Sequence, residues 1–171
     1  MTTLIKHKRV EFSELFYDLV FVFAISKATT LIEHLHNGIL TWNSFLDFFM
    51  AVLVLTDSWM IQTVYTNRYG KNSLFNMVIM FIKMGLLLFI ANMIGPDWQQ
   101  YFHYLCWAVG TLTFTLFLQY LVEFFRKSTD NVERESIKGF LWITGLGSLG
   151  VYLAALLPIY VRVYIFFASI L

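Results

Sequence analysis

Six charged residues stand inside stretches that are apolar enough to lie in a lipid bilayer. They are Glu14, Asp18, Lys27, Asp47, Asp57 and Lys83. A charge in the hydrocarbon layer is costly, so such residues usually face protein or water and commonly mark a route for protons, ions or solutes. These residues therefore form a candidate intramembrane charged site. The alternative is a set of buried ion pairs that only fixes how the helices pack.

Glu14 and Asp18 are four residues apart, which places them on the same face of a helix. Glu14 lies near the helix start, where the helix dipole favours an acid, so it also has a structural explanation. Asp18 lies deeper in the apolar run and is expected to point into the bundle. It is either part of a proton or cation site near the inner mouth, or a structural residue that is a member of a buried ion pair or a protonated acid.

The other charges sort by their depth in the membrane. Asp57 and Lys83 each lie about nine residues from the inner end of their segment, hence ~13 Å deep, and we predict that they form an ion pair. By the same argument Lys27 matches Asp47, nearer the outer side. Lys27 and Asp18 are separated by about two and a half helical turns, so they point in opposite directions and cannot share a partner.

The composition indicates which elements carry these residues. The 171 residues are 58% hydrophobic and only 13% charged, whereas soluble domains carry roughly 25% charge. Since about 20 apolar residues span a bilayer, we predict an all-α, polytopic transmembrane helical bundle forming one domain over 1–171. The predicted complete spans are 13–36, 44–66, 74–94, 101–124 and 139–157.

A sixth apolar segment, 159–171, follows Pro158 and is too short for a full crossing, since it extends only about 20 Å. We therefore expect the chain to be the N-terminal part of a longer architecture. The basic residues predict the orientation, because cytoplasmic loops are rich in Lys and Arg. One side has Arg162 alone, and the other has Lys6, Lys8, Arg9, Arg68, Lys71, Arg126, Lys127, Arg134 and Lys138. The N-terminus is therefore expected in the cytoplasm, with Asn37 and Asp97 outside.

Several classes of protein find no support in the sequence. The net charge of +1 gives no reason to expect nucleic acid, and Cys106 is the only cysteine. His34, His36 and His103 fall near the predicted outer face, but histidines two residues apart on a helix diverge, so we expect no metal site. The chain has no nucleophile motif, phosphate loop or dinucleotide fingerprint. We expect no enzyme activity, no catalytic residues and no cofactor.

Two further patterns concern helix packing. The fourth span places polar-capable residues at four-residue spacing, which predicts hydrogen bonds between helices or a cavity lining; they are His103, Trp107, Thr111, Thr115, Gln119 and Glu123. The fifth span contains Gly147, Gly150 and Ala154, and small residues let helix backbones approach closely in membranes.

The stretch "ELFYDLVFVFA", from Glu14 to Ala24, places two acids in an aromatic frame. It resembles the N-terminal motif of the bacterial low temperature requirement A (LtrA) family, and Asp57 followed by Trp59 is similar to family members too. Phe12 stands where a Trp is frequent in the family. The resemblance covers about the front half of a family member, because family members continue with more spans.

This resemblance implies a multi-pass protein of the bacterial plasma membrane. A transporter-like or channel-like role is expected, proton-coupled in one interpretation, with an unknown small solute or ion. The alternative is a non-transporting membrane protein that supports envelope function or growth at low temperature. The expected partners are the lipid bilayer and either the remaining half of the architecture or a second copy of the chain.

Overall fold

The computed structural model describes residues 12–33, 41–70, 73–95, 98–126 and 131–170, and every regular element in them is a helix. The helices are α1 (Phe12–Ala28), α2 (Thr30–Glu33), α3 (Trp42–Tyr69), α4 (Leu74–Met93), α5 (Trp98–Arg126), α6 (Asn131–Leu156) and α7 (Ile159–Ile170). The predicted all-α fold is confirmed.

Five stretches are long and apolar enough to cross a membrane, and they match the five predicted spans. They are Phe12–Glu33, Ser44–Tyr69, Leu74–Met93, Gln100–Arg126 and Arg134–Leu156. The shorter apolar helix Val161–Ile170 corresponds to the predicted sixth segment. The cytoplasmic position of the N-terminus stays a prediction, and both Asn37 and Asp97 lie outside the described residues.

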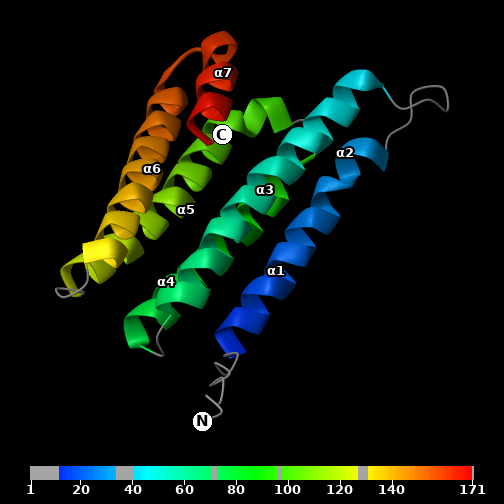
Figure 1. The fold of residues 1–171 in the computed structure, drawn as a ribbon. Helices are drawn as coiled ribbons and strands as arrows, with labels where there is room; N and C mark the ends of the chain where they lie inside the picture. The colour runs from blue at the N-terminus through cyan, green and yellow to red at the C-terminus, as the bar shows by residue number, and fades with distance from the viewer. Residues whose placement is uncertain (1–11, 34–40, 71–72, 96–97, 127–130, 171) are drawn as a thin grey trace.

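The long helices run up and down beside one another (Figure 1). Helix α4 packs chiefly against α1 and α5, α5 packs against α6, and α6 packs against α7. Helix α3 contacts α1 and α5. Consecutive helices are therefore not always the closest neighbours, since α3 and α4 contact each other less than either contacts α1.

Polar side chains and a proline define the helix ends. The hydroxyls of Thr41 and Ser73 cap α3 and α4 by accepting hydrogen bonds from backbone amides three residues on, at 3.4 and 3.3 Å. Pro158 separates α6 from α7, and the Arg162 guanidinium donates two hydrogen bonds, of 2.9 and 2.6 Å, to the carbonyl of Leu157. A cation at this position satisfies carbonyls left free at the end of α6.

The first span is interrupted at Thr29, between α1 and α2. The hydroxyl of Thr29 donates to the carbonyl of Ser26 at 2.6 Å, and that of Thr30 donates to the carbonyl of Lys27 at 2.7 Å. Side-chain bonds of this kind compete with the helical ladder and bend helices, which accounts for the break between α1 and α2 inside the first span, Phe12–Glu33.

Helix α6 begins at Asn131, well before the predicted start of the fifth span at residue 139. Its first turns are polar and are stabilised by local charge contacts: Lys138 pairs with Glu135 at 2.6 Å, and the Arg134 guanidinium lies 4.9 Å from the ring centre of Phe124. Part of the predicted polar connection is therefore helical, because an apolar pattern locates the crossing segment and not the end of the helix.

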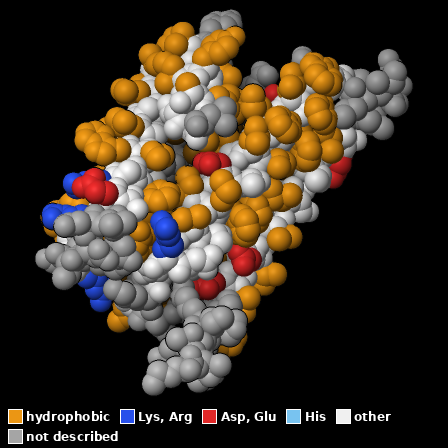
Figure 2. All heavy atoms as spheres, in the orientation of Figure 1, with side chains coloured by type: hydrophobic (Ala, Val, Ile, Leu, Met, Phe, Trp, Pro, Cys, Tyr) orange, Lys and Arg blue, Asp and Glu red, His pale blue; other side chains and the backbone are white. Residues whose placement is uncertain are grey.

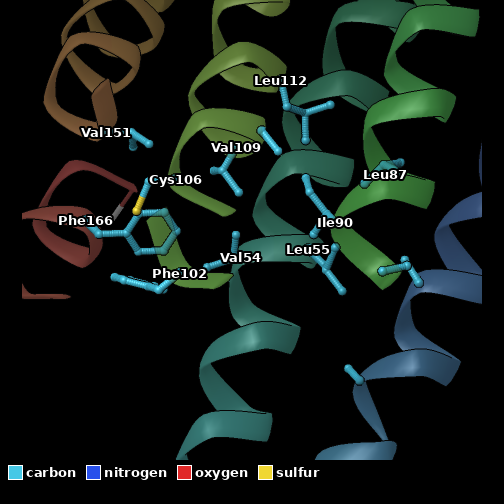
Figure 3. Packing of buried hydrophobic residues seen from close by; sticks show 14 of the residues in the cluster. Val54, Leu55, Leu87, Ile90, Phe102, Cys106, Val109, Leu112, Val151 and Phe166 are labelled. Carbon is cyan, nitrogen blue, oxygen red and sulfur yellow. The ribbon is translucent and has the colours of Figure 1, made fainter. Parts of the chain in front are cut away.

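The core is apolar and is built by side chains of α1, α3, α4, α5, α6 and α7, most of which are seen in Figure 3. Leu55, Leu87, Phe102, Cys106 and Phe166 are among its buried side chains. Hydrophobic side chains also cover much of the outer face seen in Figure 2, where the charged ones are few and scattered and the basic ones gather at the left. An apolar exterior is the arrangement expected of a bundle surrounded by lipid.

Candidate functional site

Polar side chains of three helices meet at Lys83, in the middle of α4. Its ammonium donates hydrogen bonds to the amide oxygens of Gln62 on α3 and Gln119 on α5. The exposed fractions of these three side chains are only 1, 2 and 1%. Inside the hydrocarbon layer a polar group must find its partners within the protein, and two amide oxygens supply them here.

The predicted ion pair between Asp57 and Lys83 is therefore wrong: these two described residues do not pair, and the ammonium is held by amides instead. The prediction failed in the direction in which the two side chains point around their helices. Asp57 is five residues before Gln62, a rotation of about 500°, so the two point about 140° apart on α3. Asp57 lines a cavity with side chains of α5, α6 and α7.

Glu14 and Asp18 both line an open groove between α1 and α3, as expected from their shared helix face. The groove has a volume of about 190 Å³, and α3 contributes Trp59, Gln62 and Thr66 to it. The indole Nε1 of Trp59 donates a 2.8 Å hydrogen bond to the Asp18 carboxylate. One acid of the pair is thus fixed by an aromatic donor from the neighbouring helix.

Asp18 is exposed at this groove and does not lie inside the core, which differs from the expectation that it points into the bundle. The buried face of α1 consists of Ser13, Tyr17, Ala24 and Ala28. Asp18 follows Tyr17 directly and is therefore rotated by about 100° from that face. The small buried residues bring α1 against α4 and leave Asp18 beside α3.

A second, smaller cavity adjoins the groove and leads toward the buried amides. Glu14, Gln62 and Thr66 line both spaces, and Gln119 lines the inner one. The Gln62 amide donates to the Thr66 hydroxyl at 3.0 Å while its oxygen accepts from Lys83. Gln62 therefore stands between the acidic groove and the buried ammonium.

The outer pair of predicted charges lies away from this groove. The Lys27 ammonium is 5.8 Å from the ring centre of Phe23, one turn earlier on α1. Asp47 lines an apolar cavity together with Leu31, Val54 and other core residues. The pairing of Lys27 with Asp47 stays a prediction.

Three members of the polar stripe of α5 make contacts with other helices. His103 Nδ1 lies 2.9 Å from the carbonyl of Ala155 on α6, and Tyr152 donates to the hydroxyl of Thr111 at 3.2 Å. Gln119, further along, faces Lys83 on the other side. The stripe thus winds from α6 toward α4, as four-residue spacing predicts, because each step advances about 40° around the helix.

Gln62 is the functional candidate that the sequence interpretation missed. The prediction considered only charged residues in this span. A glutamine inside an apolar span, followed by Thr66 four residues later on the same face, also indicates hydrogen bonding between helices. Trp59 was noted only for its resemblance to the family.

As for metals, the described residues contain no group of three His, Cys, Asp or Glu side chains that could hold an ion, and His34 and His36 lie outside those residues.

Five membrane-length helices with charged and amide side chains between them define a polytopic α-helical membrane protein. Residues 9–171 match the family model described as bacterial low temperature requirement A protein (LtrA). The chain belongs to this family, which confirms the resemblance of its N-terminal motif. No curated protein and no solved structure shows significant similarity to it.

Proposed function

We propose that the protein is a transporter-like or channel-like component of the bacterial plasma membrane, in which a small solute or ion enters the groove at Glu14 and Asp18. The observation that carries the proposal is the continuity between the groove, the inner cavity and Lys83: Gln62 lines both spaces and bonds the ammonium. No enzyme activity is part of this proposal.

The chemistry of the groove suits a proton or a cation. It holds two carboxylates on one helix face, with hydroxyl and amide groups of Thr63, Thr66 and Asn67 opposite them on α3. Oxygen-rich surfaces of this kind hold hard cations and water. Lys83, buried behind Gln62, would then act as a fixed positive charge against which a proton or ion is exchanged.

The alternative role is structural, and one observation favours it. Lys83 is fully buried and directly links α3, α4 and α5 through its two amide partners. Such a link would specify helix packing without any movement of solute. The two roles differ in whether water reaches the groove while the protein is in its membrane.

Cysteine labelling tests this difference. In a Cys106→Ala background, which removes the native buried thiol, Thr63→Cys places a thiol in the groove and Leu153→Cys places one on the apolar exterior. A charged methanethiosulfonate reagent should modify the first and spare the second, because it reacts with thiolates in water. Two equally unreactive positions would favour the structural role.

Proton movement is tested with Asp18→Asn, which keeps an oxygen to accept the bond from Trp59 and removes only the charge. Proteoliposomes loaded with a pH-sensitive dye, with a potassium diffusion potential as driving force, should acidify faster with the unaltered protein than with the variant. Glu135→Gln, at an exposed pair on α6, is the matched control and should behave like the unaltered protein. A stable Asp18→Asn protein with full flux would contradict the role given to this residue.

A further inference from the structure

Asp57 lies near the middle of α3 and lines a cavity that is separate from the groove and whose lining is partly polar and partly aliphatic. The cavity holds about 30 Å³ and is lined by side chains of α3, α5, α6 and α7. Its polar lining consists of the Asp57 carboxylate and the hydroxyls of Ser58, Thr113, Thr144 and Ser169. A space of this size accommodates one water-sized particle.

The hydroxyls offer oxygen lone pairs to this cavity. Thr113, Thr144 and Ser169 each donate their proton to the backbone carbonyl four residues earlier in the same helix, at 3.0, 2.7 and 2.7 Å. Their donor capacity is therefore used, and only acceptor capacity remains. Within the described part of the chain, the Asp57 carboxylate makes no side-chain hydrogen bond and no ion pair, and the Ser58 hydroxyl makes no side-chain hydrogen bond.

The glycines of α6 bring the α7 hydroxyl to this place. A Cβ atom on Gly150 would lie 2.2 Å from Ser169 Oγ, and one on Gly147 would lie 3.0 Å from the Ser169 backbone oxygen. Larger residues at either position would push α7 away. The small-residue pattern recognised in the sequence thus assembles the cavity as well as the packing of the two helices.

We propose that this cavity binds one monovalent cation of the size of Na⁺. An ionised carboxylate inside a membrane span is stabilised by a positive partner, and Lys83 is not that partner, because Gln62 and Gln119 hold its ammonium. Hard oxygen ligands select alkali and alkaline-earth cations. A single negative charge balances a monovalent one, and the small volume requires the ion to lose most of its hydration shell. This inference does not depend on the proposed solute pathway.

The test is the dependence of thermal stability on Na⁺, measured with the purified chain in lipid nanodiscs. The melting temperature should rise with NaCl concentration and saturate, and should not rise with choline chloride at equal ionic strength, because a ligand that binds only the folded state stabilises it. Radioactive ²²Na⁺ should bind at one site per chain. Asp57→Asn should abolish both effects, and Asp47→Asn, which alters an acid of a different cavity, should retain them.

A second variant covers the case in which Asp57→Asn does not fold. Thr144→Val keeps the side-chain shape and removes one ligand oxygen, so it should weaken the apparent Na⁺ affinity at least tenfold. Equal melting in NaCl and choline chloride would overturn the proposal. So would an Asp57→Asn protein that still binds ²²Na⁺, or a Thr144→Val protein with unaltered affinity.

Discussion

The amide cluster around Lys83 makes a specific prediction about stability. Gln62→Leu combined with Gln119→Leu removes both acceptors and leaves an ammonium buried among apolar atoms, since only 1% of Lys83 is exposed. Lys83→Met removes the charge and leaves two amide oxygens without their donor. The triple variant with Met and both Leu residues removes every member of the cluster.

The expected order of destabilisation follows from what each change leaves unpaired. Stranding a buried charge costs about 3–5 kcal/mol in soluble proteins. Lys83→Met leaves two neutral acceptors, each costing about 1–3 kcal/mol, but it also removes the penalty of burying an ammonium, so we expect about 1–3 kcal/mol in total. The triple variant should cost about 1 kcal/mol or less, because replacing all partners by apolar groups of similar shape is nearly neutral.

Reversible unfolding from mixed micelles, followed by circular dichroism, measures these differences. Lys138→Met, at an exposed position on α6 paired with Glu135, is the control and should change stability by about 1 kcal/mol or less. The ranking, with the double glutamine variant the least stable, is the refutable part. A triple variant as unstable as the double variant would refute the assignment of Gln62 and Gln119 as the partners that hold Lys83.

Two other predictions follow from the fold. Gly150→Ala should destabilise the protein by about 1–3 kcal/mol through overpacking, because its Cβ would lie 2.2 Å from Ser169 Oγ. Gly85→Ala, with no atom within 4 Å of its Cβ, is the control and should be tolerated. Ser169→Gly should relieve the destabilisation by Gly150→Ala, and equal melting temperatures of the two alanine variants would contradict this packing. For orientation, an impermeant thiol reagent added to intact cells should modify a cysteine at Asn37 but not one at Lys71, and the reverse result would overturn the cytoplasmic N-terminus.

The bundle was predictable because a membrane span is determined by length and hydrophobicity, and both can be read along the chain. The break at Thr29 was not predictable in the same way, since it depends on which carbonyls the hydroxyls of Thr29 and Thr30 reach. The early start of α6 at Asn131 was missed for a related reason: polar residues can extend a helix beyond the membrane without any apolar pattern.

The sequence predicted that Glu14 and Asp18 share a site, but it did not predict which side chains meet Lys83. Counting residues from a span end assigns Asp57 and Lys83 similar positions along their helices, but which side chains meet depends on which helices are neighbours. Helix α4 packs chiefly against α1 and α5, so consecutive position in the chain was a poor guide to contact. The prediction that Glu14 and Asp18 share one site was correct, because both lie on one helix, where the spacing alone sets the shared face.

The separation of Asp57 from Lys83 also bears on the choice between a functional and a structural role. A structural role is served well by an ion pair, and an apolar pair of similar volume is often equally stable or more so. Here each charge instead has its own neutral surroundings: amides for Lys83, and a hydroxyl-lined cavity for Asp57. A cation bound at Asp57, as proposed above, would be exchangeable in these surroundings, and packing alone does not require such a site. The arrangement therefore supports the proposal of an ion site within the membrane more than the alternative in which the charges only hold helices together.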